Sequence, residues 1–471
     1  MSRLLVLPLA ALALVVALAL SACTGSSTSP PPSSNSASSP AASAPAPETP
    51  STSPATGTST DWYQYHANAA RTGDVSGLPL AGRLRLAWSR PLGGAVTGQP
   101  LVIGSTVIAA TEQDEVYGLS RATGAVLWHT KVGTPVPGSQ QPCGDLDPLG
   151  IASTPVYDPQ TRLVYVVGQA GKSAHVLAGL TLSGRIALRR AVPSPDHHAY
   201  YDQQRGALAL GDGRIYVVFG GHAGDCGPYI GSVVGMPASG TGKIVSYRVP
   251  TKAQAGIWAP AGPVIASNGT VYISDGNGAT TAARFDGSDS VTALSPDLKR
   301  IGWFAPPNWK VLSANDLDLG STSPALLSNG QILQVGKSMT GFLLNGSRLG
   351  GVGGQIAQAQ VCAAFGGTAV SGQTVYEPCN SGLTAVGTAH DMVRVIWRGP
   401  AGVGGSPVLG GGAVFVASPT SGVLDELDPA TGRVRYQIKV AGSLPHFVSP
   451  SLSGGLILIG TTSGVVAIAG A

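Results

Sequence analysis

Hydrophobic residues recur along this chain in short runs that end at glycine-containing turns. In the clearest unit, residues 115–128, the run Val116–Leu119 leads through the turn Arg121–Gly124 to a second run that ends at Trp128. A glycine at the end of such a turn can adopt a positive φ. The unit therefore predicts two antiparallel strands joined by a tight turn, and a single hairpin of this kind needs further strands to be stable.

The same unit returns clearly at residues 423–436 and more weakly at 175–188, 233–247, 291–303, 342–350 and 383–397, with a half copy at 465–468. Each copy follows a small residue or proline, a short apolar run, a glycine turn and another apolar strand. There are eight such starts, at Pro100, Pro155, Ala207, Pro263, Pro324, Thr368, Pro407 and Pro450. The last two stand about 43 residues apart, which is close to the length of a four-stranded propeller blade. The pattern predicts an all-β fold, an eight-bladed β-propeller of four-stranded antiparallel blades over residues 61–471.

The two ends of the repeat region predict how the ring closes. The last copy stops after its third strand at Ile468, and residues 83–92 supply an apolar strand that contains Trp88. We expect this N-terminal strand to complete the last blade, which would leave no gap in the ring. Aromatic residues that end the other hairpins are expected to pack between blades: Trp128, Tyr247, Trp303, Trp397 and Tyr436.

The repeat resembles that of the pyrroloquinoline-quinone-type β-propellers. The opening stretch Asp61–Gly73, with Trp62, Asn68 and Arg71-Thr72-Gly73, is similar to the N-terminal segment of the same group. The resemblance covers about residues 61–471. It implies the fold more than an activity, because the group contains quinone-dependent dehydrogenases and also non-catalytic proteins such as the outer-membrane assembly lipoprotein of Gram-negative bacteria.

Residues 1–22 predict the signal peptide of a bacterial lipoprotein. The apolar stretch Leu4–Leu20 is followed by Leu20-Ser21-Ala22-Cys23, which matches a lipobox. Cys23 would carry the lipid; an ordinary secretory signal with a chance cysteine is the alternative. Residues 23–60 are rich in Ser, Thr, Pro and Ala and predict a disordered tether. We expect an exported protein that is lipid-anchored to the outer face of the bacterial cell membrane.

Composition narrows the range of partners. Charged residues make up 11% of the chain and the formal net charge is +4, whereas globular proteins average about 25% charged residues. No basic cluster stands out, so we expect no nucleic-acid partner. A monomer is the expected state.

Four cysteines remain after Cys23, and an even number in an exported protein suggests disulfides. In the predicted blade register, Cys143 and Cys362 precede the innermost strands of their blades. Cys226 and Cys379 follow the second strands, and both kinds of loop lie on one face of the ring. We expect the pairs Cys143–Cys226 and Cys362–Cys379; free thiols or a metal site are the alternatives, and the spacings match no common zinc pattern.

Polar residues gather in the same loops, where ligands of propellers usually bind. The candidate ligand mouth contains Asp147, His197, His198, Asp202, Arg205, His222, Trp258, Asp316, Asp318 and His446. Other polar residues in these loops include Glu112, Asp114, Asp145, Asp225, Asp275 and Asn277. A metal site built from His197, His198, His222 and Asp225 is a weaker alternative, because no tight ligand spacing supports it, and no metal is expected. Solvated loop residues would also explain the pattern.

The leading functional hypothesis is a cell-surface lipoprotein whose propeller is a non-catalytic binding or scaffolding module. Its ligand, a protein or a small molecule, would bind at one propeller face, and no cofactor or catalytic residue is expected. The alternative is a quinone-dependent dehydrogenase with pyrroloquinoline quinone and calcium. The family resemblance implies adjacent cysteines and a Glu-Asn-Asp calcium set in such an enzyme; the chain has no Cys-Cys pair, and the calcium set cannot be placed. A hydrolase ranks last, because neither a Gly-x-Ser-x-Gly elbow nor a His-Glu-x-x-His helix is present.

Overall fold

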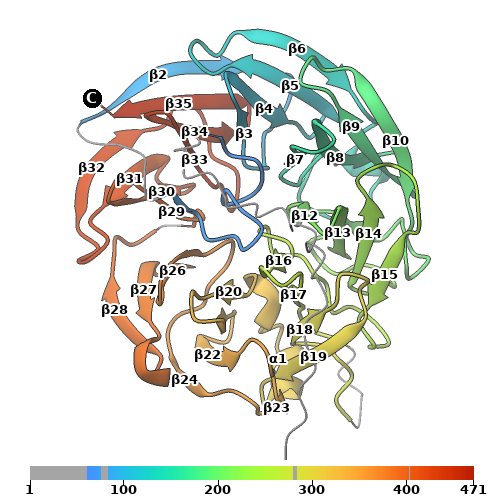
Figure 1. Cartoon of the computed structure of the whole chain (residues 1–471), viewed down its shortest axis with the longest axis vertical. Helices are drawn as coiled ribbons and strands as arrows, with labels where there is room; N and C mark the ends of the chain where they lie inside the picture. Colours follow the sequence, from blue (N-terminus) through green and yellow to red (C-terminus); the bar gives the residue numbers. More distant parts are fainter. Residues whose placement is uncertain (1–60, 76–82, 279–283, 403, 471) are drawn as a thin grey trace, which may run out of the picture. The chain divides into compact units, whose positions relative to one another are not determined.

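The computed structural model describes residues 61–75, 83–278, 284–402 and 404–470. These residues form eight antiparallel sheets arranged in a ring, which confirms the predicted eight-bladed propeller (Figure 1). The predicted signal peptide at 1–22, the lipid-bearing Cys23 and the tether at 23–60 lie outside the described residues. Within the described ranges, no helix is long and apolar enough to cross a bilayer.

Blades are numbered here in chain order, with strands given from the axis outward. Blade 1 contains β3 (Leu101–Ile103), β4 (Thr106–Ala110), β5 (Glu115–Ser120) and β6 (Val126–Lys131). Blade 2 contains β7 (Val156–Asp158), β8 (Leu163–Gln169), β9 (His175–Leu180) and β10 (Ile186–Val192). Blade 3 contains β12 (Ala209–Gly211), β13 (Arg214–Gly221), β14 (Ser232–Pro237) and β15 (Val245–Arg248), with β11 (Asp202–Gln203) beside β13. Blade 4 contains β16 (Val264–Ile265), β17 (Val271–Ser274), β18 (Val291–Leu294) and β19 (Arg300–Ala305).

The second half of the ring follows the same plan. Blade 5 contains β20 (Ala325–Leu326), β21 (Gln331–Val335), β22 (Thr340–Asn345) and β24 (Ala357–Gln360). Blade 6 contains β25 (Ala369–Ser371), β26 (Thr374–Cys379), β27 (Gly382–Gly387) and β28 (Arg394–Arg398). Blade 7 contains β29 (Val408–Gly410), β30 (Ala413–Ser418), β31 (Val423–Leu427) and β32 (Val434–Lys439), and β1 (Asp74–Val75) lies parallel to β29. Blade 8 contains β33 (Ser451–Ser453), β34 (Leu456–Thr461), β35 (Gly464–Gly470) and β2 (Leu84–Pro91).

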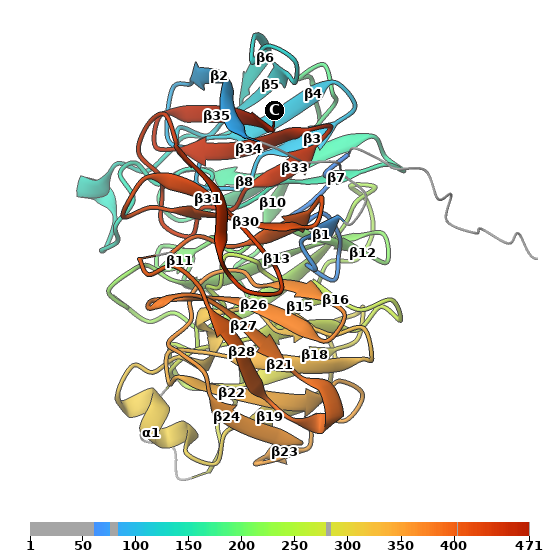
Figure 2. The ribbon, with the colours of Figure 1, turned by 90° about the vertical axis from the view of Figure 1, so that its left-hand side faces the viewer.

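In the part of the chain that the structure describes, helical structure is confined to short connections. The α-helix α1 (Trp309–Ala314) precedes blade 5, and three 3₁₀ turns are η1 (Gly138–Gln140), η2 (Leu319–Ser321) and η3 (Ala389–Asp391). Helix α1 and β11 lie on the same side of the ring in Figure 2. This side carries the loops that precede the innermost strands and the loops between the second and third strands, and it is called the loop face below.

Every predicted blade start falls one or two residues before an innermost strand. Pro100 directly precedes β3, for example, and Pro450 directly precedes β33. Proline has no N–H to donate to a sheet, so it suits the position just before a strand. The faint copy at 342–350 is wrong in its second half: the outer strand of blade 5 is β24, and β23 (Gly351–Val352) pairs instead with β19 of blade 4.

Burial explains why inner strands read as continuous apolar runs while outer strands do not. All internal positions of β13, Ile215 to Gly220, are buried, because both faces of the strand pack against neighbouring blades. The outermost strand β6 instead alternates between more and less exposed side chains. The inner strands therefore give the repeat most of its recognisable sequence pattern.

The ring closes as predicted. Strand β2 pairs antiparallel with β35 from Leu84, opposite Gly470, to Pro91, opposite Gly464. The first long strand of the described chain thus completes the last blade, and each of the eight sheets has its four strands.

Tryptophans join consecutive blades at three places. Each lies on an outermost strand and donates its indole N–H to a carbonyl in the turn between the third and outermost strands of the next blade. These bonds run from Trp88 to Arg121, from Trp128 to Leu182 and from Trp397 to Pro429, at 2.9, 2.7 and 2.9 Å. The Trp303 ring stacks instead on Phe285, from the loop between β17 and β18 of its own blade, with centroids 4.4 Å apart. Tyr436 is 40% exposed.

The segment at residues 61–75 lines the inside of the ring, which the sequence did not predict. Backbone hydrogen bonds join it to innermost strands of blades 1, 2, 4, 6 and 7. The Arg71 guanidinium donates to the carbonyls of Leu208, Tyr65 and Pro263 at 2.8, 3.1 and 3.2 Å. His66 Nε2 lies 3.0 Å from Ser449 Oγ, ahead of blade 8. The segment therefore ties together blades that are far apart in sequence.

Both predicted disulfides are present. Cys143 pairs with Cys226 and Cys362 pairs with Cys379. Cys379 is the last residue of β26 and not part of a loop. Disulfides of this kind are typical of proteins outside the cytoplasm.

Candidate functional site

The loop face contains a cavity of about 270 Å³ near the axis of the ring. Loops of blades 3, 4 and 5 provide most of its wall, and residues that precede blades 2, 6 and 8 complete it. Six residues of the predicted ligand mouth line this cavity: Arg205, His222, Trp258, Asp316, Asp318 and His446. Asp145, Asp225 and Asn277, from the same predicted loops, line it too.

The other four predicted residues lie elsewhere. His197 and His198 are exposed and do not line the cavity. Asp147 is also exposed and accepts a hydrogen bond from the Gly138 backbone N–H at 2.8 Å, which holds its own loop. Asp202 is buried in β11, 2.8 Å from the Ser194 hydroxyl. Burial, followed by the carboxylate of Asp196, raises the pKa of Asp202 to about 7.

Lys337, which the sequence analysis missed, occupies the polar centre of the cavity. Its Nζ lies 2.8 Å from a carboxylate oxygen of Asp316 and 2.8 Å from one of Asp318. Burial acts to lower the pKa of Lys337, but the two carboxylates outweigh it and raise the pKa. The ammonium group therefore stays charged. Lys337 follows β21 in the loop between the second and third strands of blade 5, so its position in the repeat was the available signal.

Asp318 is held from two sides. One carboxylate oxygen bonds to Lys337, and the other accepts the backbone N–H of Asn277 at 2.7 Å. Its side chain is almost fully buried. Trp258 closes the same corner, with the Lys337 ammonium 5.7 Å from its ring centroid, a cation–π geometry. These residues fix one another before any ligand arrives.

Arg205 provides the second positive charge. Its guanidinium lies over the Phe447 ring, 4.8 Å from the centroid. Burial lowers its pKa, while the carboxylates of Asp145 and Glu112 act to raise it. Among the described residues it forms no ion pair within 4.0 Å. Arg205 is therefore the cation in the cavity with the most capacity to bind an anionic group.

A hydroxyl–carboxylate pair forms another part of the wall. Tyr229 donates its hydroxyl hydrogen to Asp225, and burial raises the pKa of that carboxyl group. One Asp225 oxygen therefore already accepts a hydrogen bond from Tyr229, within the cavity wall. His222 lies nearby, and burial lowers its pKa, which favours the neutral imidazole.

The cavity residues do not fit a calcium ion. Calcium takes six to eight oxygen ligands, but Asp316 and Asp318 hold Lys337, and Asp225 accepts the Tyr229 hydroxyl. Across the described ranges no group of three His, Cys, Asp or Glu side chains is placed to hold a metal. The alternative of a site made by His197, His198, His222 and Asp225 therefore finds no support in this arrangement.

Comparisons with known proteins show which propellers this fold resembles. Residues 82–303 match the sequence family described as outer membrane protein assembly factor BamB. The chain contains a PQQ-like β-propeller. No curated protein sequence matches it.

Solved structures with the PQQ-like propeller include both enzymes and an assembly factor. The quinohemoprotein alcohol dehydrogenase ADHIIG from Pseudomonas putida HK5 is 13% identical, with a TM-score of 0.65, and the match covers 87% of this chain and 80% of the dehydrogenase. A europium-containing methanol dehydrogenase is 15% identical, with a TM-score of 0.63, and the match covers 87% of this chain and 98% of the enzyme. BamB from Moraxella catarrhalis is 12% identical, with a TM-score of 0.56, and the match covers 82% of this chain and 99% of BamB. At these identities the similarity shows the fold alone.

Proposed function

We propose that this chain is an extracytoplasmic lipoprotein, anchored to the membrane by a lipid on Cys23. Its PQQ-like propeller serves as a non-catalytic binding or scaffolding module. The ligand, a small molecule or a protein side chain with an anionic group, enters the cavity on the loop face. The two disulfides and the lipobox residues before Cys23 support the location.

The observation that carries the binding role is the state of Asp318. Both of its oxygens are occupied, one by Lys337 and one by the Asn277 N–H. A carboxylate that is ion-paired in this way is poorly suited to act as a general base or a metal ligand. Arg205, stacked on Phe447, supplies a charge that a ligand can use without breaking an existing pair.

The anchor leads to a first prediction. Cys23→Ala removes the thiol that would carry the lipid, so we expect the protein to leave the membrane fraction or to remain as an unprocessed precursor. Membrane fractionation followed by immunoblotting measures both outcomes. Cys143→Ala is the control, because it removes a cysteine without touching the anchor. A mature-sized Cys23→Ala protein that stays with the membrane would contradict the lipid anchor.

A quinone-dependent dehydrogenase is the second candidate function. The observation that favours it is the convergence of Trp258, Asn277 and Asp318 on one cavity. An aromatic ring could stack on a planar quinone, and a carboxylate could serve its chemistry. The ion pair of Lys337 with Asp318 and the poor fit for calcium argue against it.

Direct titration separates the two candidates. We expect pyrroloquinoline quinone, added with calcium, to show no stoichiometric binding by absorbance. We also expect no oxidation of alcohols or sugars with an artificial electron acceptor. Stoichiometric uptake with turnover that Asp318→Asn abolishes would establish the enzyme and refute the binding module.

A further inference from the structure

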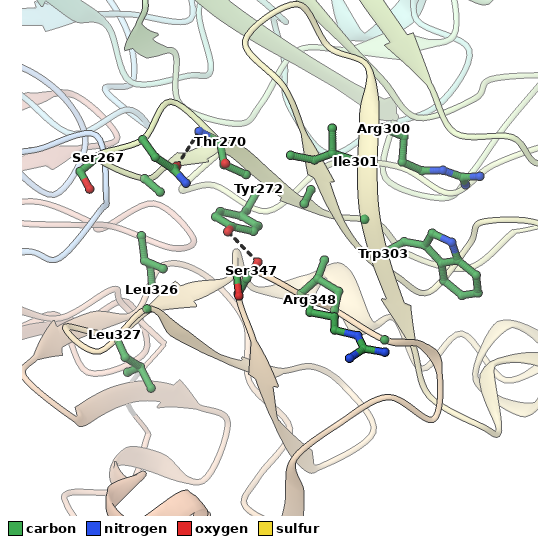
Figure 3. A pocket seen from close by; sticks show the side chains of 18 of the residues that line it. Ser267, Thr270, Tyr272, Arg300, Ile301, Trp303, Leu326, Leu327, Ser347 and Arg348 are labelled. Atoms are coloured by element: carbon green, nitrogen blue, oxygen red, sulfur yellow. Dashed lines mark hydrogen bonds between the residues drawn. The ribbon is translucent and has the colours of Figure 1, made fainter. Parts of the chain in front are cut away.

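A groove of about 890 Å³ lies between blades 4 and 5. The turns after β16 and β20 form one side of it, and β19 and the connection after β22 form the other (Figure 3). Because strand direction alternates, these turns lie on the opposite face of the ring from the cavity described above. The groove is therefore separate from the cavity of the proposed function.

Strand register explains why the groove exists. In blade 1, Trp128 pairs with Gly118 beside a β-bulge, and in blade 6, Trp397 pairs with Ala385 beside an equivalent bulge. In blade 4 the residue at this position, paired with Ala293 beside the bulge, is Gly302. Blade 4 therefore lacks the side chain that fills the contact with the next blade at Trp128 and Trp397.

The neighbouring tryptophan does not replace the missing ring. Trp303 stacks on Phe285 with an interplanar angle of 14°, and it lies at the other end of the groove from Leu326 and Leu327 (Figure 3). On the floor, the Tyr272 hydroxyl donates to the Gly346 carbonyl at 2.8 Å, which joins the two blades without filling the space. The position over Gly302, which an indole ring occupies in blades 1 and 6, is therefore open, and it is called the aromatic dock below.

The charged side chains that line the groove are all positive. Of the described residues that line it, Arg300 and Arg348 alone are charged, and both are exposed. Neither forms an ion pair within the described part of the chain. Ile301, which also lines the groove, is 61% exposed. The groove thus combines apolar side chains, such as Ile301, Leu326 and Leu327, with polar side chains and two guanidinium groups.

We propose that this groove binds a polypeptide segment of a partner protein, with an aromatic side chain over Gly302 and carboxylates against Arg300 and Arg348. Trp128 packs between blades 1 and 2 at the equivalent register position, which shows that the fold accommodates an indole there. The volume falls within the 300–1,000 Å³ typical of ligand sites and leaves room for residues on both sides of the aromatic ring. A flanking acidic segment would satisfy the arginines by bidentate pairing.

Refilling the dock provides a direct test. A Cβ added at Gly302 meets no neighbour closer than 3.8 Å, so Gly302→Trp is expected to fold with its indole in the groove. The probe is a fluorescein-labelled acetyl-Asp-Glu-Trp-Glu-Asp-amide peptide, and binding to the full-length protein is followed by fluorescence anisotropy. We expect Gly302→Trp and Arg348→Glu each to weaken binding at least tenfold. A peptide with lysines in place of its acidic residues should not bind.

Other outcomes would overturn the proposal. Failure of the acidic peptide to bind the unmodified protein, or equal binding to Gly302→Trp, would exclude the aromatic dock. If Gly302→Trp fails to fold by circular dichroism, Arg348→Glu on the exposed rim decides the question alone. Indole-3-acetate that binds as tightly as the peptide would make this a small-molecule site. A dimer in sedimentation velocity that Gly302→Trp abolishes would make the occupant a second copy of this chain.

Discussion

Glu377→Gln is expected to remove roughly 3–5 kcal/mol of the decline in stability between pH 4.5 and about 8. Glu377 is fully buried in β26, and among the described residues neither carboxyl oxygen has a hydrogen-bond partner. Val375 and Cys379 lie two residues before and after Glu377, on the same face of the strand. Both belong to the apolar cluster between blades 5 and 6. Burial raises the pKa of Glu377 from 4.5 to about 8.

The sign of the effect follows from proton uptake. Between pH 4.5 and 8 the folded protein keeps the Glu377 proton, while the unfolded chain loses it. The free energy of unfolding therefore falls as pH rises through this range, and it levels off above pH 8. The pKa difference corresponds to roughly 3–5 kcal/mol. Glu377→Gln cannot ionise, so it should exceed the unmodified protein in stability at pH 8 and match it near pH 4.5.

Urea unfolding at a series of pH values measures this effect. Glu115→Gln serves as the control, because Glu115 is only partly buried. Other buried carboxyl groups, Asp275 and Asp289 among them, will leave some pH dependence in every variant. The informative quantity is therefore the difference between the two curves. Parallel curves for Glu377→Gln and the unmodified protein would show that the carboxyl group is solvated or paired.

Arg71→Met is expected to lower the free energy of unfolding by about 3–5 kcal/mol, a loss typical of breaking a buried charged network. Arg71 is buried, and its guanidinium donates to the carbonyls of Leu208, Tyr65 and Pro263. Burial lowers its pKa to about 9. Methionine keeps part of the apolar stem but leaves these acceptors without a donor.

Chemical denaturation near pH 7 measures the change, with Arg433→Ala as the matched control. The Arg433 side chain is exposed in the turn after β31, so we expect its loss to change stability by about 0.5 kcal/mol or less. An Arg71→Met protein as stable as this control would mean that residues 61–75 do not hold the ring together. The same result would require another explanation for the burial of a guanidinium group at this point.

The eight blades could be predicted because each is a local unit. Every start, from Pro100 to Pro450, reflects the demand of one strand for apolar residues and of one turn for glycine or proline. Ring closure followed because a three-stranded last blade needs a fourth strand. The position of Trp303 was not predictable, because it lies one residue beyond the place that Trp128 and Trp397 occupy beside the equivalent bulges of their blades, and the repeat pattern does not reveal such a shift. The path of residues 61–75 depends on contacts with most of the ring, which no local pattern encodes.

The cavity was predictable in outline and not in detail. Loop position alone identified Arg205, Trp258 and Asp318 as neighbours, because the fold brings equivalent loops to one face. Lys337 escaped attention because a single lysine after a strand is common on protein surfaces. Its importance depends on two carboxylates that come from the loop before the same blade. Pairing across loops is set by distances that the sequence does not contain.

Closure of the ring by β2 and β35 also determines when the protein can finish folding. The strand that begins at Leu84 finds its partner only when the chain has been made as far as Gly470. Until then β2 has an unpaired edge, and seven blades cannot form a closed ring. Loop-closure entropy must be overcome across nearly the whole described chain before this pairing stabilises anything, which makes the step slow and leaves an aggregation-prone edge exposed. The ring is therefore completed only after the chain has been made as far as Gly470, and the edge of β2 needs protection until then.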